Sequence, residues 1–208
     1  MSGMFITFEG AEGSGKSTQI ARCEQYLKQQ GHDVLVIREP GGVKISETVR
    51  AILLDPANTE MGAECEVLLY MAARAQLVRE VILPALDAGR IILCDRFLDS
   101  TLVYQGFGHG MDLEQIRGIG DFATCKIAPS LTILFDIDTA EGLRRAGDQK
   151  DRIEQRSLEY HSRVRQGYLT LARQEPQRIK VVGVDGRKKE DIFQEVRGYL
   201  DARIQERR

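Results

Sequence analysis

Tryptophan is absent from this 208-residue chain, 5 residues are proline and 6% are aromatic. No run of uncharged apolar residues approaches the ~18 that a membrane-spanning helix needs, so we expect no membrane association. The first nine residues have no basic region and end in a glutamate, so no secretory signal peptide is expected there. These absences favour a globular chain that works in the cytoplasm.

Closely spaced cysteines and an excess of one charge are also missing. The chain has 29 Lys and Arg against 31 Asp and Glu, a formal charge of −2, so it has no basic field to hold nucleic acid. Its 4 cysteines are Cys23, Cys65, Cys94 and Cys125, which lie far apart without a nearby histidine. This spacing favours reduced cytoplasmic thiols over a zinc site or a disulfide framework.

Apolar runs and helical repeats alternate along the whole chain. Strands are predicted at 4–8, 34–37, 91–94, 131–135 and 179–184, and helices at 16–30, 45–54, 64–88 with a kink at Pro84, 153–173 and 188–204. The strands are continuous apolar runs, which is typical of a parallel sheet that helices cover on both faces. We expect one α/β domain, residues 1–208, built on five parallel strands.

The first predicted strand runs into a complete phosphate-loop pattern. Residues 10–17 read G-A-E-G-S-G-K-S and fit G-x-x-x-x-G-K-[ST]. In such a loop, backbone N–H groups point at phosphate oxygens, the lysine reaches the β- and γ-phosphates and the hydroxyl ligates Mg²⁺. The expected ATP site is therefore Gly10, Ala11, Glu12, Gly13, Ser14, Gly15, Lys16, Ser17 and Thr18, with Ser17 as a metal ligand.

A second metal ligand is expected at Asp95, directly after the strand at 91–94. An acid at the end of a neighbouring strand organises the magnesium ion in sites of this kind. The alternative for Asp95 is the N-cap of a helix. The two roles are compatible.

A triphosphate site alone leaves kinases, GTPase switches and motor ATPases open. The sequence contains no N-K-x-D tetrapeptide, the usual guanine reader of GTPases, and it is short for a motor. Arginines instead lie in R-E-P-G-G at 38–42, A-R-A-Q at 73–76 and D-R-F at 95–97. These arginines could bind a second anion beside the triphosphate.

Together with the phosphate loop, these segments closely resemble the thymidylate kinase family. S-T at 100–101, Y-Q-G at 104–106 and D-R-I-E at 151–154 also match, and the resemblance runs from Phe5 to the last helix. It implies a P-loop NTPase fold, a three-layer sandwich of the nucleoside-monophosphate kinase type. It also implies a homodimeric enzyme that uses ATP and Mg²⁺ to convert dTMP into dTDP for dTTP synthesis.

The resemblance implies a role for each acceptor residue. Arg50, Arg74 and Arg96 would surround the dTMP phosphate, and Tyr70 would stack on thymine where the family usually has Phe. Arg74 would also read the base, and Glu39 would order the loop near the metal. The full dTMP set is Glu12, Glu39, Arg50, Tyr70, Arg74, Arg96, Thr101 and Gln105. The residues alone leave open that the arginines are ordinary helix-surface residues and that Tyr70 belongs to the core.

Glu12 is informative because a carboxylate in a phosphate loop repels phosphate and must face another group. The family subtype with an acid here uses it to bind the sugar 3′-hydroxyl and carries its catalytic arginine in a lid, here about residues 144–152. The lid cations are Arg144, Arg145, Lys150 and Arg152, with Arg152 ranked first and Arg145 second. The expected catalytic residues are thus Lys16, Arg96, Arg152 and Arg145, and the choice among the lid cations stays open.

Val43 stands where the family commonly has Thr after E-P-G-G, which removes one hydrogen bond from that loop.

Two alternatives to a dTMP kinase remain. A nucleotide-gated regulatory ATPase, or a nucleoside-monophosphate kinase of other base specificity, also fits a phosphate loop. The arginines favour a kinase, because a regulator needs no acceptor-phosphate site.

Overall fold

Five parallel strands form a single sheet in the computed structural model, which describes residues 3–147 and 151–206. Their order is β2-β3-β1-β4-β5, with bounds β1 Met4–Gly10, β2 Val34–Arg38, β3 Ile91–Asp95, β4 Leu131–Asp136 and β5 Ile179–Gly183. Phe8 of β1 pairs with Asp95 of β3, and Gly10 pairs with Phe135 of β4. The carboxyl ends of these strands therefore meet at the edge where parallel sheets bind ligands.

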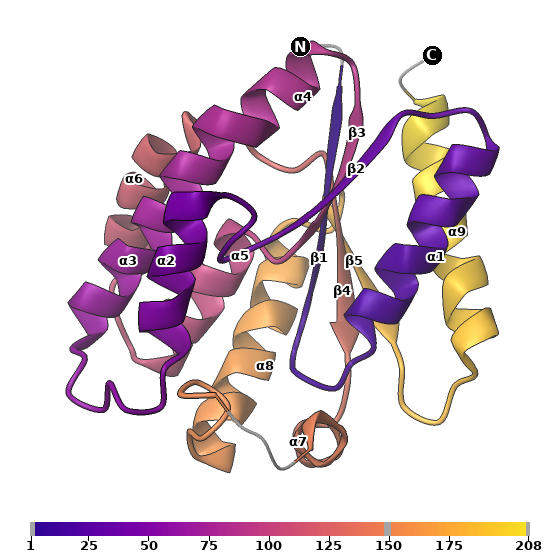
Figure 1. The fold of residues 1–208 in the computed structure, drawn as a ribbon. Helices are drawn as coiled ribbons and strands as arrows, with labels where there is room; N and C mark the ends of the chain where they lie inside the picture. Colours follow the sequence, from indigo (N-terminus) through magenta and orange to yellow (C-terminus); the bar gives the residue numbers. More distant parts are fainter. Residues whose placement is uncertain (1–2, 148–150, 207–208) are drawn as a thin grey trace.

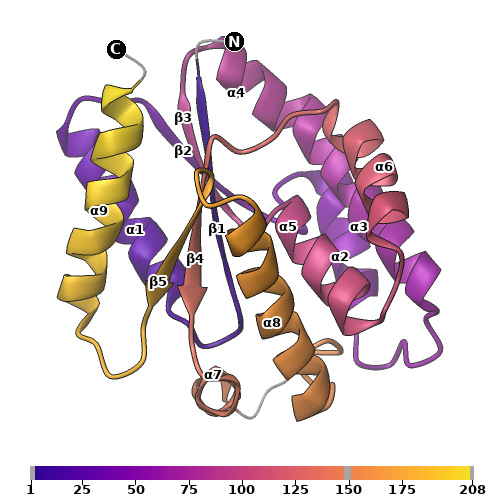
Figure 2. The same ribbon diagram turned by 180° about the vertical axis from the view of Figure 1, so that it is seen from behind.

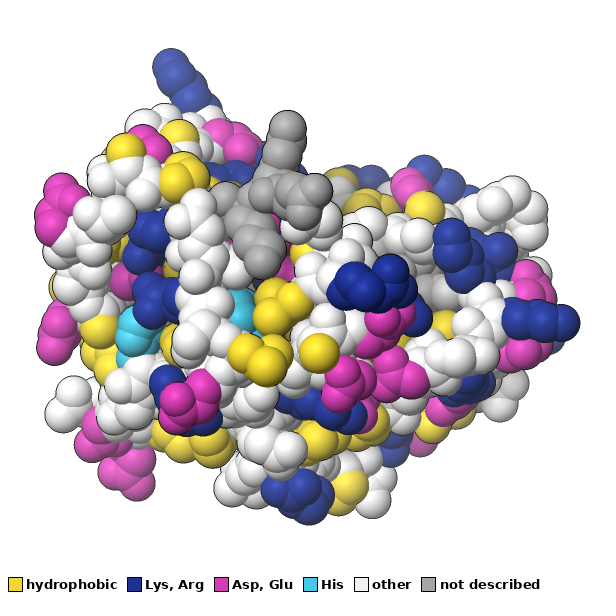
Figure 3. Space-filling view, turned by 90° about the horizontal axis from the view of Figure 1, so that it is seen from below, with side chains coloured by type: hydrophobic (Ala, Val, Ile, Leu, Met, Phe, Trp, Pro, Cys, Tyr) yellow, Lys and Arg dark blue, Asp and Glu magenta, His cyan; other side chains and the backbone are white. Residues whose placement is uncertain are grey.

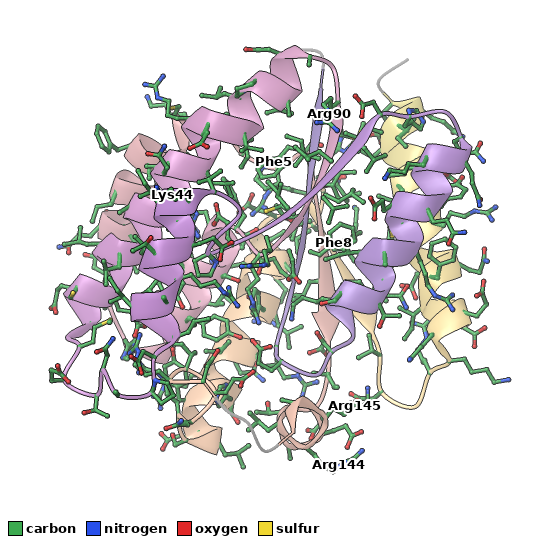
Figure 4. The ribbon with its side chains drawn as sticks, in the orientation of Figure 1. Phe5, Phe8, Lys44, Arg90, Arg144 and Arg145 are labelled. Carbon is green, nitrogen blue, oxygen red and sulfur yellow. The ribbon has the colours of Figure 1, made fainter. Side chains whose placement is uncertain are left out.

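Different helices cover the two faces of the sheet (Figure 1). On one face, α1 (Lys16–Gln29) and α9 (Lys189–Gln205) pack against the side of β1 that carries Phe8. Phe5 of the same strand belongs to the cluster on the opposite face, and Figure 4 shows the two rings on different sides. Strand β1 is buried along its whole length. Its continuous apolar run follows from this cover on both faces.

The opposite face carries a larger helical layer. It contains α2 (Lys44–Leu54), α3 (Ala63–Leu77), α4 (Leu83–Asp87), α5 (Leu98–Thr101), α6 (Leu113–Thr124) and α8 (Leu158–Gln174), with two π-helical segments, η1 (Val78–Ile82) and η2 (Leu102–Gly108). Helices α2, α3 and α6 lie side by side (Figure 2). The arrangement is a three-layer sandwich around a five-stranded parallel sheet, which confirms the expected fold class.

The region expected to form one kinked helix at 64–88 is helical over nearly that range, but it is divided into three helical segments. It consists of α3, then the π-helical η1, then α4. Pro84 has no N–H to donate to the preceding turn, and the wider turn of η1 lies immediately before it. Neither this stretch nor any other helix in the described part of the chain is long and apolar enough to cross a lipid bilayer.

The helix expected at 153–173 begins later, at Leu158, which corrects the prediction. Asp151 Oδ1 accepts a hydrogen bond from the N–H of Ile153 at 2.8 Å and closes a non-helical turn. Ser157 then caps α8, because its hydroxyl accepts from the N–H of Tyr160 at 3.2 Å. The turn precedes α8 and keeps the D-R-I-E segment out of the helix.

The segment expected to form the lid, about residues 144–152, begins inside a helix. Helix α7 (Thr139–Ala146) starts at Asp138, whose side chain accepts from the N–H of Ala140 at 3.1 Å, and it includes Arg144 and Arg145. Figure 1 shows α7 below the sheet, at the carboxyl ends of the strands. The beginning of the lid is therefore helical and lies over the edge where the site is expected.

Candidate active site

The turn between β1 and α1 has the geometry that the phosphate-loop pattern predicts. Gly13 and Gly15 have φ angles of 69° and 84°, which glycine adopts without strain. The Lys16 ammonium group is buried and donates to the carbonyl oxygens of Gly10 and Ala11, each at 3.0 Å. Burial lowers the pKa of Lys16. The loop thus keeps a lysine at the carboxyl end of β1, within the turn that would cradle phosphate.

Helix α7 approaches this loop closely. A Cβ added at Gly13 would lie 2.2 Å from the carbonyl oxygen of Gly142 and 2.8 Å from Cβ of Arg145. A Cβ added at Gly142 would lie 2.7 Å from the carbonyl oxygen of Glu12. Glycine at both positions lets the two backbones touch, and the contact brings the last turn of α7 to the phosphate loop.

A cavity of about 400 Å³ beside the loop is lined by residues expected to bind ATP and by residues expected to bind dTMP. Its lining includes Glu12, Gly13, Gly15, Lys16, Ser17 and Thr18 from the ATP set, and all of the dTMP set: Glu12, Glu39, Arg50, Tyr70, Arg74, Arg96, Thr101 and Gln105. Gly10, Ala11 and Ser14 belong to the loop but not to this lining. Figure 3 views this end of the molecule, where basic and acidic side chains are interspersed.

Arg96 follows β3 and is held from several sides. One terminal nitrogen, Nη2, donates to the Glu12 carboxylate. The other, Nη1, donates to Ser100 Oγ at 3.2 Å and to the Tyr168 hydroxyl at 3.3 Å, and the guanidinium lies 5.2 Å from the centre of the Tyr104 ring. Burial alone would raise the pKa of Glu12, but the charge of Arg96 brings it below its ordinary value. The loop carboxylate therefore faces an arginine.

Arg74 forms a buried ion pair at the floor of the cavity. Its Nε donates to Glu39 Oε2 at 2.7 Å, and the two side chains are 2% and 4% exposed. Its Nη2 donates to the carbonyl oxygen of Phe97 at 3.0 Å. Burial raises the pKa of Glu39, and the charge of Arg74 opposes that rise. The structure thus excludes an ordinary exposed position for this arginine.

The remaining residues of the expected dTMP set reach the cavity from the surrounding helices. Arg50 is half-buried and donates to a backbone carbonyl oxygen in the loop after β2 at 2.9 Å. Tyr70 lines the cavity from α3, and burial raises the pKa of its hydroxyl. Thr101 is buried, and Gln105 Nε2 donates to Glu66 Oε1 at 2.7 Å. Together they place an aromatic ring, a cation and two polar groups around one space.

Ser17 and Asp95 lie together where the loop meets the end of β3. Ser17 Oγ donates to Asp95 Oδ2 at 3.5 Å. Asp95 Oδ1 is buried and has no hydrogen-bond partner among the described residues. A buried carboxylate oxygen without a donor, beside a hydroxyl at the phosphate loop, fits the oxygen ligands that Mg²⁺ prefers.

Arg152, the lid cation ranked first, is held away from the cavity. Its Nη2 lies 2.6 Å from Glu66 Oε2, and its Nε donates to the carbonyl oxygen of Leu53 at 2.8 Å. Its neighbours Asp151 and Glu154 line the cavity, whereas its own side chain does not. In this arrangement Arg152 ties the end of the lid to α2 and α3.

The other lid cations have different environments. Arg145 packs beside Gly13, and its Nε donates to Glu141 at 2.7 Å. Arg144 pairs with the same glutamate but is 72% exposed. Figure 4 shows Arg145 on the side of α7 nearer the phosphate loop. Lys150 lies outside the described residues.

Glu9 and Tyr168 belong to the site although the sequence pattern does not single them out. Glu9 is fully buried; its Oε1 accepts from the N–H of Phe97 at 2.8 Å, and its Oε2 accepts from Ser100 Oγ at 2.6 Å and the Tyr168 hydroxyl at 2.8 Å. A charged residue that ends an apolar strand is a local signal for Glu9. Tyr168 has no such signal, because only the packing of α8 on the sheet brings it there.

Comparison with known proteins places this geometry in a family. The family profile described as "Thymidylate kinase" matches residues 8–196. The chain belongs to the thymidylate kinase family. Thymidylate kinase of Syntrophotalea carbinolica is 52% identical over 190 residues, which cover 88% of each chain, and that of Geobacillus thermodenitrificans is 44% identical over 209 residues, covering 99% of this chain and 92% of the relative.

A solved thymidylate kinase shares the fold. The crystal structure of the enzyme from Ehrlichia chaffeensis superposes with a TM-score of 0.78 at 32% sequence identity, covering 96% of this chain and 99% of that one. The match therefore covers almost the whole chain. The resemblance to the thymidylate kinase family predicted from the sequence is therefore confirmed.

Proposed function

We propose that this chain transfers the γ-phosphoryl group of ATP to dTMP and forms dTDP. Membership of the thymidylate kinase family makes it a phosphotransferase with a phosphate group as acceptor. The observation that carries the proposal is the single cavity lined by the phosphate loop on one side and by Arg50, Arg74 and Arg96 on the other. Direct transfer requires donor and acceptor phosphates to meet in one such space.

The phosphate loop would bind the donor. Phosphate oxygens of ATP would accept from the backbone N–H groups at the start of α1, where the helix dipole is positive. The Lys16 ammonium, which donates to loop carbonyls here, would turn to the β- and γ-phosphates. Ser17 and Asp95 would hold Mg²⁺, which neutralises charge on the phosphates when it is bound.

The arginines would bind the acceptor. A dTMP phosphate is mostly dianionic near neutral pH, since its second pKa is about 6, and guanidinium groups bind such anions in a bidentate manner. The Glu39 carboxylate fixes Arg74, and the Tyr70 ring would stack on the base. Thr101 and Gln105 would flank the nucleoside, and Glu12 would accept from the sugar hydroxyl.

The chemistry needs positioning and charge neutralisation more than proton transfer. The acceptor oxygen is already ionised, so no general base has to remove a proton from it. Lys16 and Arg96 would offset repulsion between two polyanions and stabilise charge on the transferring group. A lid that closes over both substrates would keep water from hydrolysing ATP.

Arg145 is the described lid residue best placed to supply further charge. Its Cβ lies beside Gly13 at the phosphate loop, although its guanidinium pairs with Glu141 and, like that of Arg152, does not line the cavity; Arg152 is bound to Glu66. The ranking from sequence, with Arg152 first, is therefore reversed in the proposal. Arg152 instead would hold the D-R-I-E segment, so that Asp151 and Glu154 face the acceptor space.

The enzyme would work as a homodimer in the cytoplasm. Exposed apolar side chains gather on the adjacent helices α2, α3 and α6, namely Ile45, Ile52, Leu68, Ile119 and Phe122. An apolar surface of this kind is typical of a protein interface. All 4 cysteines are free thiols, which agrees with a reducing compartment.

An ATP-consumption assay with a panel of nucleoside monophosphates tests the proposal. We expect dTMP to be the best acceptor, dUMP to be weaker and AMP and GMP to be poor; one methyl group contributes about 1–3 kcal/mol of discrimination. Preference for AMP or GMP would indicate another base specificity. ATP hydrolysis at a rate that does not depend on any nucleoside monophosphate would indicate a regulatory ATPase.

A Lys16→Ala variant with an unchanged circular dichroism spectrum should lose nearly all turnover.

A further inference from the structure

Tyr168 contacts Arg96 from outside the substrate cavity. The tyrosine is 3% exposed, comes from α8 and is not among the residues that line the cavity. Its hydroxyl accepts from Arg96 Nη1 at 3.3 Å, as does Ser100 Oγ at 3.2 Å. Two hydroxyl groups therefore support one nitrogen of a guanidinium that faces the cavity.

The buried Glu9 carboxylate orients both hydroxyl groups. Glu9 Oε2 accepts from Ser100 at 2.6 Å and from Tyr168 at 2.8 Å. A hydroxyl has one proton and two lone pairs. When Glu9 is ionised, each hydroxyl can donate its proton to Oε2, and the lone pairs of both oxygens, which lie 2.9 Å apart, are left to accept from Arg96. The network therefore presents acceptors, not donors, to the guanidinium.

The two hydroxyl groups and Glu12 bind different terminal nitrogens of the same guanidinium. Glu12 accepts from Nη2 of Arg96, and Tyr168 and Ser100 accept from Nη1. Since the guanidinium is planar and rigid, support at two nitrogens fixes the plane of the whole group. Glu12 alone would leave the plane free to rotate about the Nη2 contact.

We propose that Tyr168 is a positioning residue for the acceptor phosphate, because its hydroxyl, held by Glu9, fixes the guanidinium plane of Arg96. The inference rests on the proposed function, in which Arg96 binds the dTMP phosphate. Tyr168 touches neither substrate in this scheme. Its contribution therefore depends entirely on Arg96, which makes it separable from a general effect on folding.

Removal of the hydroxyl alone is the direct test. Tyr168→Phe keeps the buried ring and should raise KM for dTMP about fivefold, the scale of one lost hydrogen bond, while KM for ATP stays within twofold. The matched control is Tyr160→Phe on the same helix, whose hydroxyl donates to the carbonyl oxygen of Tyr104 at 2.9 Å. The control should lower Tm by a similar small amount and leave KM for dTMP within twofold of the wild type.

An Arg96→Ala background shows whether Tyr168 acts through Arg96. kcat/KM for dTMP, measured at limiting dTMP, should fall about fivefold on Tyr168→Phe in the wild type and by less than twofold in Arg96→Ala. Equal losses in both backgrounds, an unchanged KM in Tyr168→Phe or an equal loss in Tyr160→Phe would overturn the inference. A wild-type protein that does not phosphorylate dTMP would instead refute the proposed function.

Discussion

At the scale of single residues, the site depends on charged groups that the fold buries in pairs. Arg74 and Glu39 are almost fully enclosed, yet they line the space expected for dTMP. A buried charge is costly unless a partner and further hydrogen bonds compensate for it. Substrate binding and folding stability are therefore coupled at this pair, and a single substitution there is expected to change both.

Arg74→Ala should weaken the protein and the acceptor site together. It leaves the Glu39 carboxylate buried without its cation, which typically costs about 3–5 kcal/mol of folding free energy. Urea unfolding measures that loss, and kinetics should show a raised KM for dTMP with KM for ATP nearly unchanged. Arg79→Ala, at an exposed position on η1, is the control for arginine removal.

A second change separates the two effects of Arg74. Arg74→Met combined with Glu39→Gln removes both charges and should recover most of the lost stability without restoring the affinity for dTMP. Recovery of both properties would show that Arg74 supports the fold only.

Glu9 predicts a pH dependence of stability. Burial, and then the charge of Asp99, raise the pKa of Glu9 from 4.5 to about 7. Between these values the unfolded chain loses the proton that the folded chain keeps, so the contribution of this group to stability is full below pH 4.5 and is lost as the pH rises through 7. Glu9→Gln cannot ionise, so its Tm relative to the wild type should increase from pH 5 to pH 8. A constant or decreasing difference in Tm would contradict this.

At the scale of elements, α7 contacts the phosphate loop, and the proposed role of Arg145 depends on that contact. Gly142 and Gly13 allow the two backbones to touch, and Arg145 lies at that contact. Glu66 meanwhile holds Arg152 against α3. Burial alone would raise the pKa of Glu66, but hydrogen bonds from His109 and Gln105 and the two nearby arginines bring it to about 2. The acid is therefore a permanent anchor at neutral pH.

The adjacent residues Arg144 and Arg145 on α7 allow a test of the catalytic lid arginine, with Arg144 as the control. Arg145→Ala should lower kcat by roughly 10³-fold or more, as expected for an arginine that stabilises a transferring phosphoryl group, with nucleotide binding little changed. Arg144→Ala removes an equal charge paired with the same Glu141, but on the exposed side, and should keep kcat within twofold. Steady-state kinetics with both substrates measures both variants. A normal kcat in Arg145→Ala would remove α7 from the mechanism.

At the scale of the whole molecule, exposed apolar side chains lie on the neighbouring helices α2, α3 and α6. Leu68 of α3 and Phe122 of α6 are 56% and 87% exposed, which is unusual for residues of this size. Self-association through this surface would remove them from water.

Sedimentation velocity tests the dimer. The wild type should have twice the 23.4 kDa of one chain, and Leu68→Asp with Phe122→Asp should be monomeric, because two buried carboxylates would oppose association. Leu158→Asp, at an apolar position in the first turn of α8 that is 53% exposed, should remain dimeric. A monomeric wild type would exclude the homodimer.

The sequence by itself determined the five strands, most of the long helices, the phosphate loop and the family. These features depend on neighbours in the chain: continuous apolar runs predict the buried strands, and the pattern around Lys16 predicts the loop between strand and helix. All eight residues expected around dTMP line one cavity, and their binding of dTMP stays a prediction. Boundaries that depend on side-chain caps, such as the start of α8 at Leu158, were placed too early.

Only the tertiary structure decided which charged side chains meet. Arg152 lies 86 positions from Glu66 in the chain, and Tyr168 lies 159 positions from Glu9, so no local pattern predicts either contact. Ion pairs and hydrogen bonds act over a few ångströms. The packing of α8 on the sheet sets the distance from Tyr168 to Glu9, and the turn before α8, packed on α2 and α3, sets the distance from Arg152 to Glu66. The sequence ranks Arg152 above Arg145, and the proposal reverses that order because Arg152 is bound to Glu66 and the Cβ of Arg145 lies beside Gly13.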